Sequence, residues 1–300
     1  MENILLLGLG AIGSLVASKF TDNKVDVDIL LDEERHERYS KNKYYINDIE
    51  YNFSYVTPKS YDKKADFVII ATKYNQLPNA IAQLDGLIAE DCTIMSLLNG
   101  IDSEEIIGKK LGADKLVYAF ITGTDATRES NRNYFTADGI IYFGEKSGAD
   151  SQRTKDIARL FDKIDMKYKL SDDIITKQWK KYMINIGMNQ VSAVLNATYG
   201  DFMKSEEIIT LTHKAMRETV SIAQKRGISL QEKDVLASTD FLSKFSPDGK
   251  TSMLQDVCAK RKTEVEMLAE TLIKMGREHN VPTPINEVLY LQLKAIESMY

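Results

Sequence analysis

Lys181, Asn185 and Asn189 form the most suggestive chemical pattern in this sequence. They recur at four-residue intervals within residues 172–195, a stretch without proline, so on an α-helix they share one face and drift by about 40° per step. A lysine can protonate an oxygen that gains negative charge, and carboxamides can hold the polar groups of a small molecule. Asparagine is a poor helix former, and a solvated face gives no reason to repeat it. We predict a catalytic face here, with a solvated polar face as the alternative and Lys180, about 100° away, as the neighbouring candidate acid.

The start of the chain carries a glycine pattern typical of phosphate binding. The apolar run Ile4–Leu7 predicts a buried strand, and a helical pattern follows the glycines. In a Gly-x-Gly-x-x-Gly loop the glycines permit a tight turn, the approach of a pyrophosphate and close packing of the helix, whose N-terminus attracts phosphate. The alternative is a glycine-rich turn in an ordinary βα unit. We predict that a dinucleotide contacts the loop residues Gly8, Leu9, Gly10, Ala11, Ile12 and Gly13.

Asp32 stands at the end of the second predicted strand, near the distance from the glycine loop at which an acidic residue meets the adenosine ribose. A carboxylate there accepts hydrogen bonds from ribose hydroxyls and repels a 2′-phosphate, which favours NADH over NADPH. Two alternatives stay open. Asp32 can simply cap the next helix, and Arg35 or Arg38 can still reach a 2′-phosphate.

A further polar cluster begins at Ser252 and includes Glu264. Ser252 is placed to be a helix N-cap with Gln255 as its capping-box partner, which is the structural alternative to ligand binding. On one continuous helix Glu264 would lie about 18 Å beyond Ser252. We therefore expect these two side chains to contact different parts of an extended pair of substrate and cofactor.

Hydrophobic periodicity predicts the elements that position these residues. Predicted strands comprise residues 4–7, 25–31, 65–72, 93–98, 116–121 and 167–170, with a hairpin over 44–55 and further β character over 135–143. Predicted helices comprise residues 11–21, 33–40, 151–164, 172–195, 205–226, 254–278 and 285–299. The strand 65–72 delivers Lys73 and Gln76 to the sheet edge where ligands bind in such folds.

The change in pattern at Leu170 predicts an α/β part followed by an all-α part. We predict a Rossmann-type dinucleotide-binding domain over residues 1–170 and a helical domain for substrate binding and catalysis over residues 171–300.

Composition excludes several other classes of protein. The net charge of −5 provides no basic footprint for nucleic acid, and no apolar run is long enough to span a membrane. Met1-Glu2 leads directly into the first strand with no secretory signal pattern, and the two cysteines are far apart, so we expect a reduced, cytoplasmic protein. The three histidines show no metal-ligand spacing, and no metal site is expected.

In this order the motifs resemble the ketopantoate reductase (2-dehydropantoate 2-reductase) family over essentially the whole chain. The motifs are the glycine loop, Lys73 with Gln76, Asn99-Gly100, Trp179-Lys180-Lys181 with Asn185 and Asn189, and Ser252-Met253-Leu254-Gln255-Asp256 with Glu264. The resemblance implies that Lys181 is the catalytic acid and that Asn185, Asn189 and Ser252 bind substrate. It also implies that Lys73 and Glu264 bind cofactor, that Asn99 lies against both ligands, and that the backbone of Ala126 contacts cofactor.

Two positions depart from the family pattern. Many members hold the 2′-phosphate of NADPH, the usual family cofactor, with an arginine where this chain has Asp32. A substrate-binding asparagine of some members falls near Tyr199 here, although Asn196 is close by. By analogy with related helical domains, we expect a homodimer.

The combined hypothesis is hydride transfer from NADH or NADPH to the C2 carbonyl of 2-dehydropantoate, with Lys181 as general acid, forming pantoate for pantothenate and coenzyme A biosynthesis. The first alternative is a D-2-hydroxyacid dehydrogenase that acts on other branched 2-oxo acids. The second is a dinucleotide-sensing protein without catalytic activity, which would not need Lys181, Asn185 and Asn189 on one helix face.

Overall fold

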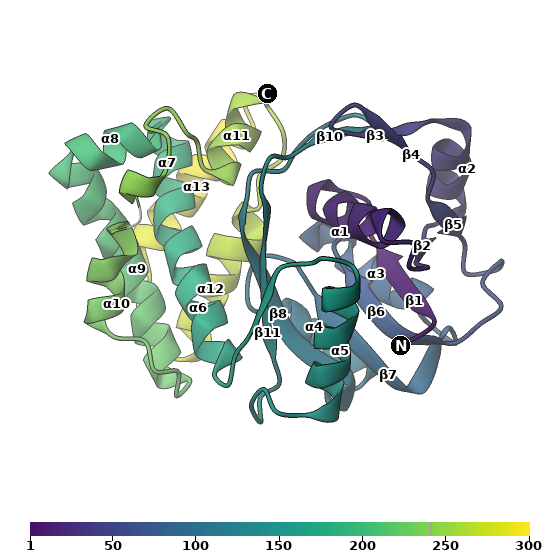
Figure 1. Cartoon of the computed structure of the whole chain (residues 1–300). Coiled ribbons are helices and arrows are strands. Elements are labelled where there is room, and N and C mark those ends of the chain that lie inside the picture. The colour runs from purple at the N-terminus through teal and green to yellow at the C-terminus, as the bar shows by residue number, and fades with distance from the viewer. Residues whose placement is uncertain (241) are drawn as a thin grey trace. The chain divides into compact units, whose positions relative to one another are not determined.

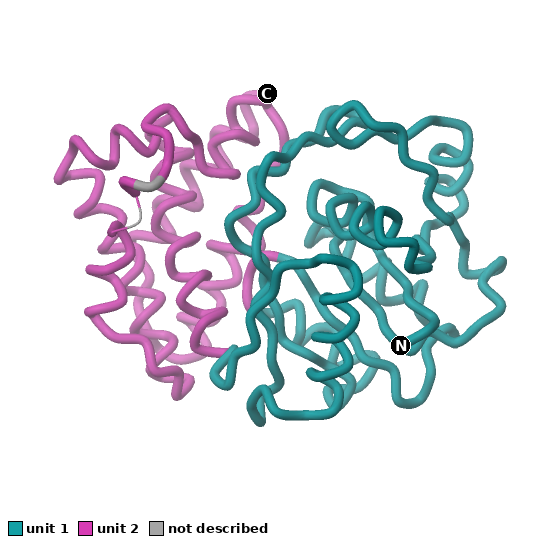
Figure 2. The backbone as a smooth tube through the Cα atoms, in the orientation of Figure 1, with its two compact units in different colours: residues 1–98, 102–174 teal, residues 99–101, 175–300 magenta. Residues whose placement is uncertain are grey.

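The computed structural model describes residues 1–240 and 242–300, which divide into two compact units (Figures 1 and 2). Unit 1 comprises residues 1–98 and 102–174, and unit 2 comprises residues 99–101 and 175–300. The expected combination of an α/β part and a helical part is confirmed. The short segment 99–101 groups with the helical unit, although the residues before and after it in the sequence belong to unit 1.

Unit 1 is built on an eight-stranded sheet with the spatial order β12-β11-β8-β7-β6-β1-β2-β5. Its strands are β1 (Ile4–Leu7), β2 (Asp28–Leu30), β5 (Ser54–Val56), β6 (Ala65–Ile70), β7 (Ile88–Ser96), β8 (Leu116–Thr124), β11 (Asp138–Gly144) and β12 (Tyr168–Leu170). The strands from β5 to β8 are parallel, and β11 pairs with β8 in the antiparallel direction. Chain order reverses direction at β1, so β1 and its neighbours mark the switch point where doubly wound sheets bind ligands.

Helices cover both faces of this sheet. The helical segments of unit 1 are α1 (Ala11–Asp22), α2 (Glu33–Lys41), α3 (Leu77–Gln83), α4 (Ser103–Leu111) and α5 (Gln152–Lys163), with short 3-10 helices at Tyr74–Gln76 and Ala113–Lys115. Alternate residues of β1 point to opposite faces: Leu6 packs in a core with α1 and α5, whereas Leu5 packs in a core with α3 and α4. Burial on both faces explains why β1 is wholly apolar.

A second, four-stranded sheet has the order β4-β3-β10-β9. The predicted hairpin is confirmed as β3 (Tyr44–Ile46) and β4 (Ile49–Tyr51), which turn at Asn47-Asp48, where both residues have positive φ. A further hairpin, β9 (Thr127–Glu129) with β10 (Arg132–Tyr134), was not predicted, and β10 runs parallel to β3.

Unit 2 is helical, with no strand among residues 175–240 and 242–300. Its helices are α6 (Ile174–Ile184), which begins at the last residue of unit 1, α7 (Gln190–Leu195), α8 (Tyr199–Lys204), α9 (Glu206–Lys225), α10 (Glu232–Leu236), α11 (Ser252–Cys258), α12 (Thr271–Glu278) and α13 (Pro284–Glu297). Short 3-10 helices lie at Ala237–Thr239 and Leu242–Lys244, and single π-helical turns lie at Asn185–Asn189 and Glu266–Glu270. None of the helices in the described part of the chain has the length and apolarity that a membrane span requires.

Two predictions about these helices were wrong. The uninterrupted α-helix expected over residues 172–195 contains the π turn Asn185–Asn189. The continuous helix expected from Ser252 to Glu264 ends instead at Cys258, and Lys260 then has a φ of +50°. The N-cap of α11 is Thr251, whose side chain accepts a hydrogen bond from the Leu254 N–H, so Ser252 is the first helical residue. Thr and Ser are both preferred N-cap residues, and Ser slightly more so, so residue type alone did not point to Thr251.

Candidate functional site

The glycine loop between β1 and α1 has the steric requirements predicted for it. Gly8 has a φ of +98°, and a Cβ at this position would lie 2.6 Å from the carbonyl oxygen of Ala71. A Cβ at Gly13 would lie only 1.9 Å from the carbonyl oxygen of Gly8. A Cβ at Gly10, by contrast, would meet no atom within 4 Å. Gly8 and Gly13 are therefore required by the fold, whereas Gly10 leaves open space beside the N-terminus of α1, as close approach of a pyrophosphate demands.

Side chains of the four-stranded sheet donate hydrogen bonds to backbone carbonyl groups of the same loop. The Leu9 carbonyl accepts hydrogen bonds from the Tyr44 hydroxyl at 3.1 Å and from Arg128 Nη1 at 2.7 Å. Asn133 Nδ2 donates to the Tyr44 hydroxyl at 2.6 Å and lies 3.4 Å from the Gly10 carbonyl oxygen. Sequence reasoning missed Arg128 and Asn133, because no local motif marks them and only the pairing of β10 with β3 and with β9 brings them to the loop.

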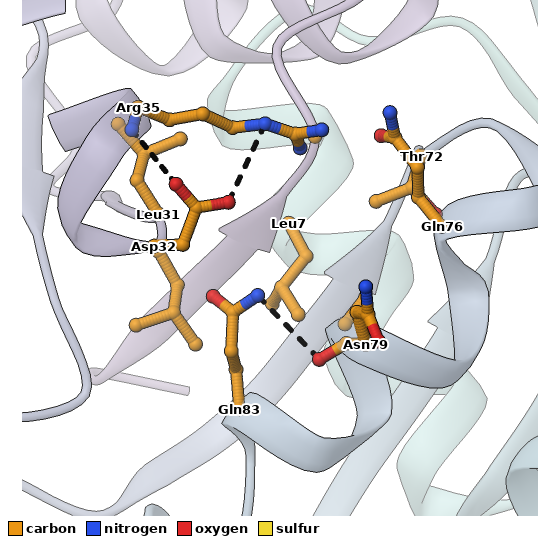
Figure 3. Close-up of a pocket in the computed structure, with 11 residues that line it drawn as sticks. Leu7, Leu31, Asp32, Arg35, Thr72, Gln76, Asn79 and Gln83 are labelled. Carbon is orange, nitrogen blue, oxygen red and sulfur yellow. Dashed lines mark hydrogen bonds and ion pairs between the residues drawn. The ribbon is translucent and has the colours of Figure 1, made fainter. Parts of the chain in front are cut away.

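A pocket opens at the carboxyl ends of β1, β2 and β6, the predicted edge of the sheet (Figure 3). It is lined by Leu7, Gly8, Leu30, Leu31, Asp32, Arg35, Thr72, Gln76, Asn79, Ala80 and Gln83. Leu7 and Leu30 end their strands, and the polar groups gather on the surrounding loops and helices. A carboxylate, a guanidinium and carboxamides around an apolar floor fit the ribose and base of a nucleotide.

Asp32 caps a helix, which is the structural alternative considered for it from the sequence, and it also lines the pocket. Its Oδ1 accepts the N–H of Arg35 at 2.7 Å, which caps α2, and its Oδ2 lies 3.5 Å from Arg35 Nε (Figure 3). The side chain of Asp32 is 45% exposed, so the carboxylate also faces the pocket. Arg35 partly neutralises this carboxylate, and the pocket therefore carries one acidic and one basic group side by side.

Two other predicted cofactor-binding residues of unit 1, Lys73 and Ala126, each follow a strand of the sheet in the sequence. Lys73 is exposed and directly precedes the 3-10 helix that carries Gln76, which lines the pocket. Ala126 lies between β8 and β9, and its N–H donates to Thr124 Oγ1 at 3.2 Å. Only the Ala126 carbonyl is therefore left for a backbone contact without breaking that bond.

In unit 2 three predicted site residues form one hydrogen-bonded chain. Lys181 Nζ donates to Asn99 Oδ1 at 2.8 Å, and Asn99 Nδ2 donates to Glu264 Oε2 at 3.0 Å. The three residues come from α6, from the segment 99–101 and from the loop before the second π turn. The carboxamide of Asn99 is thereby oriented, with its oxygen toward the ammonium group and its nitrogen toward the carboxylate.

The surroundings of Lys181 favour proton transfer. Burial lowers the pKa of its ammonium group to about 8, and the negative charge of Glu264 acts in the opposite direction by favouring the protonated form. An acid with a pKa near the working pH is both protonated and able to give up its proton. Lys180, in contrast, pairs with Asp234 of α10 at 2.8 Å, which marks it as a structural lysine.

Asn185 and Asn189 begin and end the π turn, and both are half-buried. Among the described residues neither side-chain amide makes a hydrogen bond, so both are available to a ligand. Ser252 is exposed at the first position of α11. Because α11 ends at Cys258, the distance of about 18 Å expected between Ser252 and Glu264 along one helix no longer applies.

Among the described residues no group of three or more His, Cys, Asp or Glu side chains is arranged to hold a metal ion.

Two family models match consecutive parts of the chain. The model described as "Ketopantoate reductase PanE/ApbA" matches residues 4–148, and the model described as "Ketopantoate reductase PanE/ApbA C terminal" matches residues 173–297. A curated 2-dehydropantoate 2-reductase from Streptococcus pyogenes is 22% identical over 286 residues, which cover 94% of this chain and 93% of the relative.

Solved structures with the same fold include a D-mandelate dehydrogenase with NADH and anilino(oxo)acetate, with a TM-score of 0.87 at 20% identity and coverage of 99% of both chains. A dimeric ketopantoate reductase from Staphylococcus aureus matches with a TM-score of 0.78, also at 20% identity and 99% coverage of both chains. At this identity the likeness to solved structures establishes the fold alone.

Proposed function

Since the chain belongs to the ketopantoate reductase family, an oxidoreductase family, we propose that it reduces 2-dehydropantoate to pantoate with NADH or NADPH, a step of pantothenate and coenzyme A biosynthesis. The observation that carries this proposal is the chain from Lys181 through Asn99 to Glu264, with a pKa of about 8 at the lysine. A protein that merely sensed dinucleotides would have no use for a desolvated lysine beside two unpartnered carboxamides.

A bound NADH or NADPH supplies the hydride that adds to the C2 carbonyl carbon. The carbonyl oxygen then gains negative charge, which the Lys181 ammonium group stabilises and finally protonates. The pair of electrons of the broken N–H bond stays on Lys181 Nζ, and the neutral amine regains a proton from solvent after each turnover. Asn99 and Glu264 orient Lys181 and favour its protonated form between turnovers.

Asn185, Asn189 and Ser252 are the proposed substrate-binding residues. A carboxamide can donate to the carboxylate and accept from the hydroxyl of 2-dehydropantoate, and the two asparagines offer such groups on the helix that carries Lys181. Ser252 offers a hydroxyl at the start of α11.

We assign the pocket of unit 1 to the adenosine end of the cofactor and the glycine loop to its pyrophosphate, with Lys73, Gln76, Ala126 and Glu264 as further contacts. Asp32 favours NADH, because its carboxylate accepts from ribose hydroxyls and repels a 2′-phosphate. The NADH in the D-mandelate dehydrogenase structure supports this preference. Arg35 beside Asp32 is the group that would have to hold the phosphate of NADPH.

The second candidate function is a D-2-hydroxyacid dehydrogenase for other branched 2-oxo acids. Two points favour it. The fold matches a D-mandelate dehydrogenase over 99% of the chain. The family resemblance also places a substrate-binding asparagine of some members near Tyr199, although Asn196 is close by. The Tyr199 ring stacks on Phe245 with centroids 4.8 Å apart, an apolar contact that an asparagine would not make.

We further propose that the protein forms a homodimer through α13. Val288 and Leu291 lie one turn apart on this helix and are 55% and 64% exposed, and the Staphylococcus aureus relative is dimeric. Light scattering of the wild type and of Leu291→Asp tests this, with a halved mass expected for the variant.

Initial rates with a panel of substrates test the proposed reaction. Ketopantoate, 2-oxoisovalerate and 2-oxoisocaproate are compared at equal concentration, each with NADH and with NADPH. We expect the highest kcat/KM with ketopantoate and NADH. A higher value with 2-oxoisovalerate or 2-oxoisocaproate would replace the first function by the second, and no turnover with any of the three would remove both.

A further inference from the structure

The π turn Asn185–Asn189 changes how the proposed substrate-binding residues line up with Lys181. In an α-helix four residues overshoot a full turn by about 40°, so Asn189 would lie about 80° around the helix from Lys181. A π turn closes on the fifth residue and is wider, so four residues fall short of a full turn. The step from Asn185 to Asn189 therefore reverses the drift and returns Asn189 toward the line of Lys181.

The side chain of Gln190 is inserted at this turn. Its Nε2 donates to the Ile186 carbonyl at 2.8 Å. In an α-helix that carbonyl would accept from the backbone N–H of residue 190, so the side chain takes a position in the backbone ladder of its own helix. Gln190 is fully buried, and water has no access to replace this bond.

A buried chain of hydrogen bonds anchors Gln190 to α13. The same Nε2 donates to Asn286 Oδ1 at 2.8 Å, and Asn286 Nδ2 donates to Glu218 Oε2 at 2.6 Å and to the Ala215 carbonyl at 3.1 Å. Asn286 is also fully buried. The position of the Gln190 amide thus depends on two other helices, α9 and α13.

Glu218 is the last residue of this hydrogen-bonded chain, and backbone N–H groups of α13 hold its carboxylate in place. Its carboxylate accepts the backbone N–H groups of Ile285 at 2.8 Å and of Asn286 at 3.1 Å, in the first turn of α13. A carboxylate is favoured at a helix N-terminus, and the side chain of Thr283, the N-cap of α13, accepts no backbone N–H there.

Helix α9 packs closely against the π turn. A Cβ on Gly187, inside the π turn, would lie 2.6 Å from Met216 Cγ and 2.9 Å from the Thr212 carbonyl oxygen. The turn is therefore held between a close backbone contact with α9 and the Gln190 side chain.

We propose that Gln190 is a positioning residue, which holds the π turn so that Asn185 and Asn189 both face the substrate beside Lys181, with Asn286 and Glu218 holding Gln190. This rests on the proposed function. The same contacts could serve folding alone, and the two roles differ in what a substitution at Gln190 does to substrate affinity.

Gln190→Met tests the proposal because it keeps the length of the side chain and removes both donated hydrogen bonds. We expect KM for ketopantoate to rise about 10- to 100-fold, since small misplacements of binding groups have effects of this size. The Kd of NADH and the pH dependence of kcat should stay unchanged, because neither the glycine loop nor Lys181 is altered. Calorimetric titration of ketopantoate into the NAD⁺-loaded enzyme should show the same loss of affinity.

Ser192→Ala is the matched control. Ser192 is also fully buried on α7, and its hydroxyl donates to the Ala197 carbonyl at 2.7 Å without touching the π turn. It should lower the thermal midpoint as a lost buried hydrogen bond does, with KM unchanged.

If Gln190→Met lowers the midpoint like the control and leaves KM within about twofold, the positioning role is overturned. If Gln190→Met does not fold, the KM and the thermal midpoint of Asn286→Ala are compared with the control in the same way. That variant removes the bond between Gln190 and Asn286 but leaves the bond from Gln190 to the Ile186 carbonyl possible. A wild-type enzyme without activity on any 2-oxo acid would count against the proposed function instead, which separates the two failures.

Discussion

The glycine loop of unit 1 and the lysine cluster of unit 2 reach their geometry in different ways. The loop is one short segment. A side chain at Gly8 or Gly13 would clash with backbone atoms, so only glycine fits at these two positions. The lysine cluster joins residues far apart in the chain, Asn99, Lys181 and Glu264, through side-chain hydrogen bonds. The shape of the first region is set by residues that are neighbours in the sequence, whereas the second depends on burial and on partners that only folding brings together. Substitutions should therefore act differently in the two regions.

The largest effect is expected from Lys181→Ala. Loss of the general acid should lower kcat by about 10²- to 10⁴-fold, while the Kd of NADH remains near the wild-type value. Steady-state kinetics and fluorescence titration of NADH measure the two quantities. Lys180→Ala is the control, because it removes only the partly exposed ion pair with Asp234 and should leave kcat nearly unchanged. A normal kcat in Lys181→Ala, or a collapse of kcat in Lys180→Ala, would move the acid to another residue.

Within the glycine loop, Gly10→Ala and Gly13→Ala should separate ligand binding from folding. Gly10→Ala meets no protein atom, so its thermal midpoint should match the wild type, while the methyl group weakens NADH binding by at least about 10-fold. Gly13→Ala places a methyl group against the Gly8 carbonyl and should lower the midpoint as well. Scanning calorimetry with and without NADH distinguishes them. If both variants bound NADH normally, the pyrophosphate would not lie on this loop.

The choice between cofactors should respond to Asp32. Asp32→Ser removes the negative charge that opposes a 2′-phosphate and leaves Arg35 unpaired, so the ratio of kcat/KM for NADPH to that for NADH should rise about 10-fold. Glu33→Gln is the matched control, because Glu33 is an exposed neighbour that pairs with Lys59. An equal change of the ratio in both variants would show that net charge near the pocket matters rather than contact with the ribose.

The smallest effect is a shift in pH dependence that reports the surroundings of Lys181. The rate of ketone reduction should be constant below pH about 8 and fall above it, because the acid is deprotonated there. Removing the charge of Glu264 in Glu264→Gln takes away the interaction that raises the lysine pKa, so the midpoint should move to lower pH. A midpoint unchanged by the substitution would mean that Glu264 does not act on Lys181 electrostatically.

Part of the fold and of the candidate site could be predicted from the sequence, because the physical causes of that part are local. The glycine loop follows from residues that are neighbours in the chain, and the hairpin at Asn47-Asp48 follows from residue types that tolerate positive φ. The alternation of strands and helices up to Leu170, and helices alone afterwards, follows from hydrophobic periodicity.

The rest depends on contacts between distant segments. Thr251 rather than Ser252 caps α11, and the helix expected to continue to Glu264 stops at Cys258. The π turn is supported by Gln190, Asn286 and Glu218 on three helices, which no periodicity in residues 172–195 reveals.

The sequence by itself determined which residue types are present and at what spacing: a glycine loop of the kind that binds phosphate in other proteins, an acidic residue after the second strand, and a lysine followed by two asparagines at four-residue intervals. Only the tertiary structure decided the surroundings, partners and directions of those groups. It separated Lys181 from Lys180 by desolvating one and pairing the other with Asp234, and it turned Asn189 back toward Lys181 by a π turn. The reason is physical: a side chain's type and spacing are written along the chain, whereas its pKa, its partners and its direction depend on the atoms packed around it.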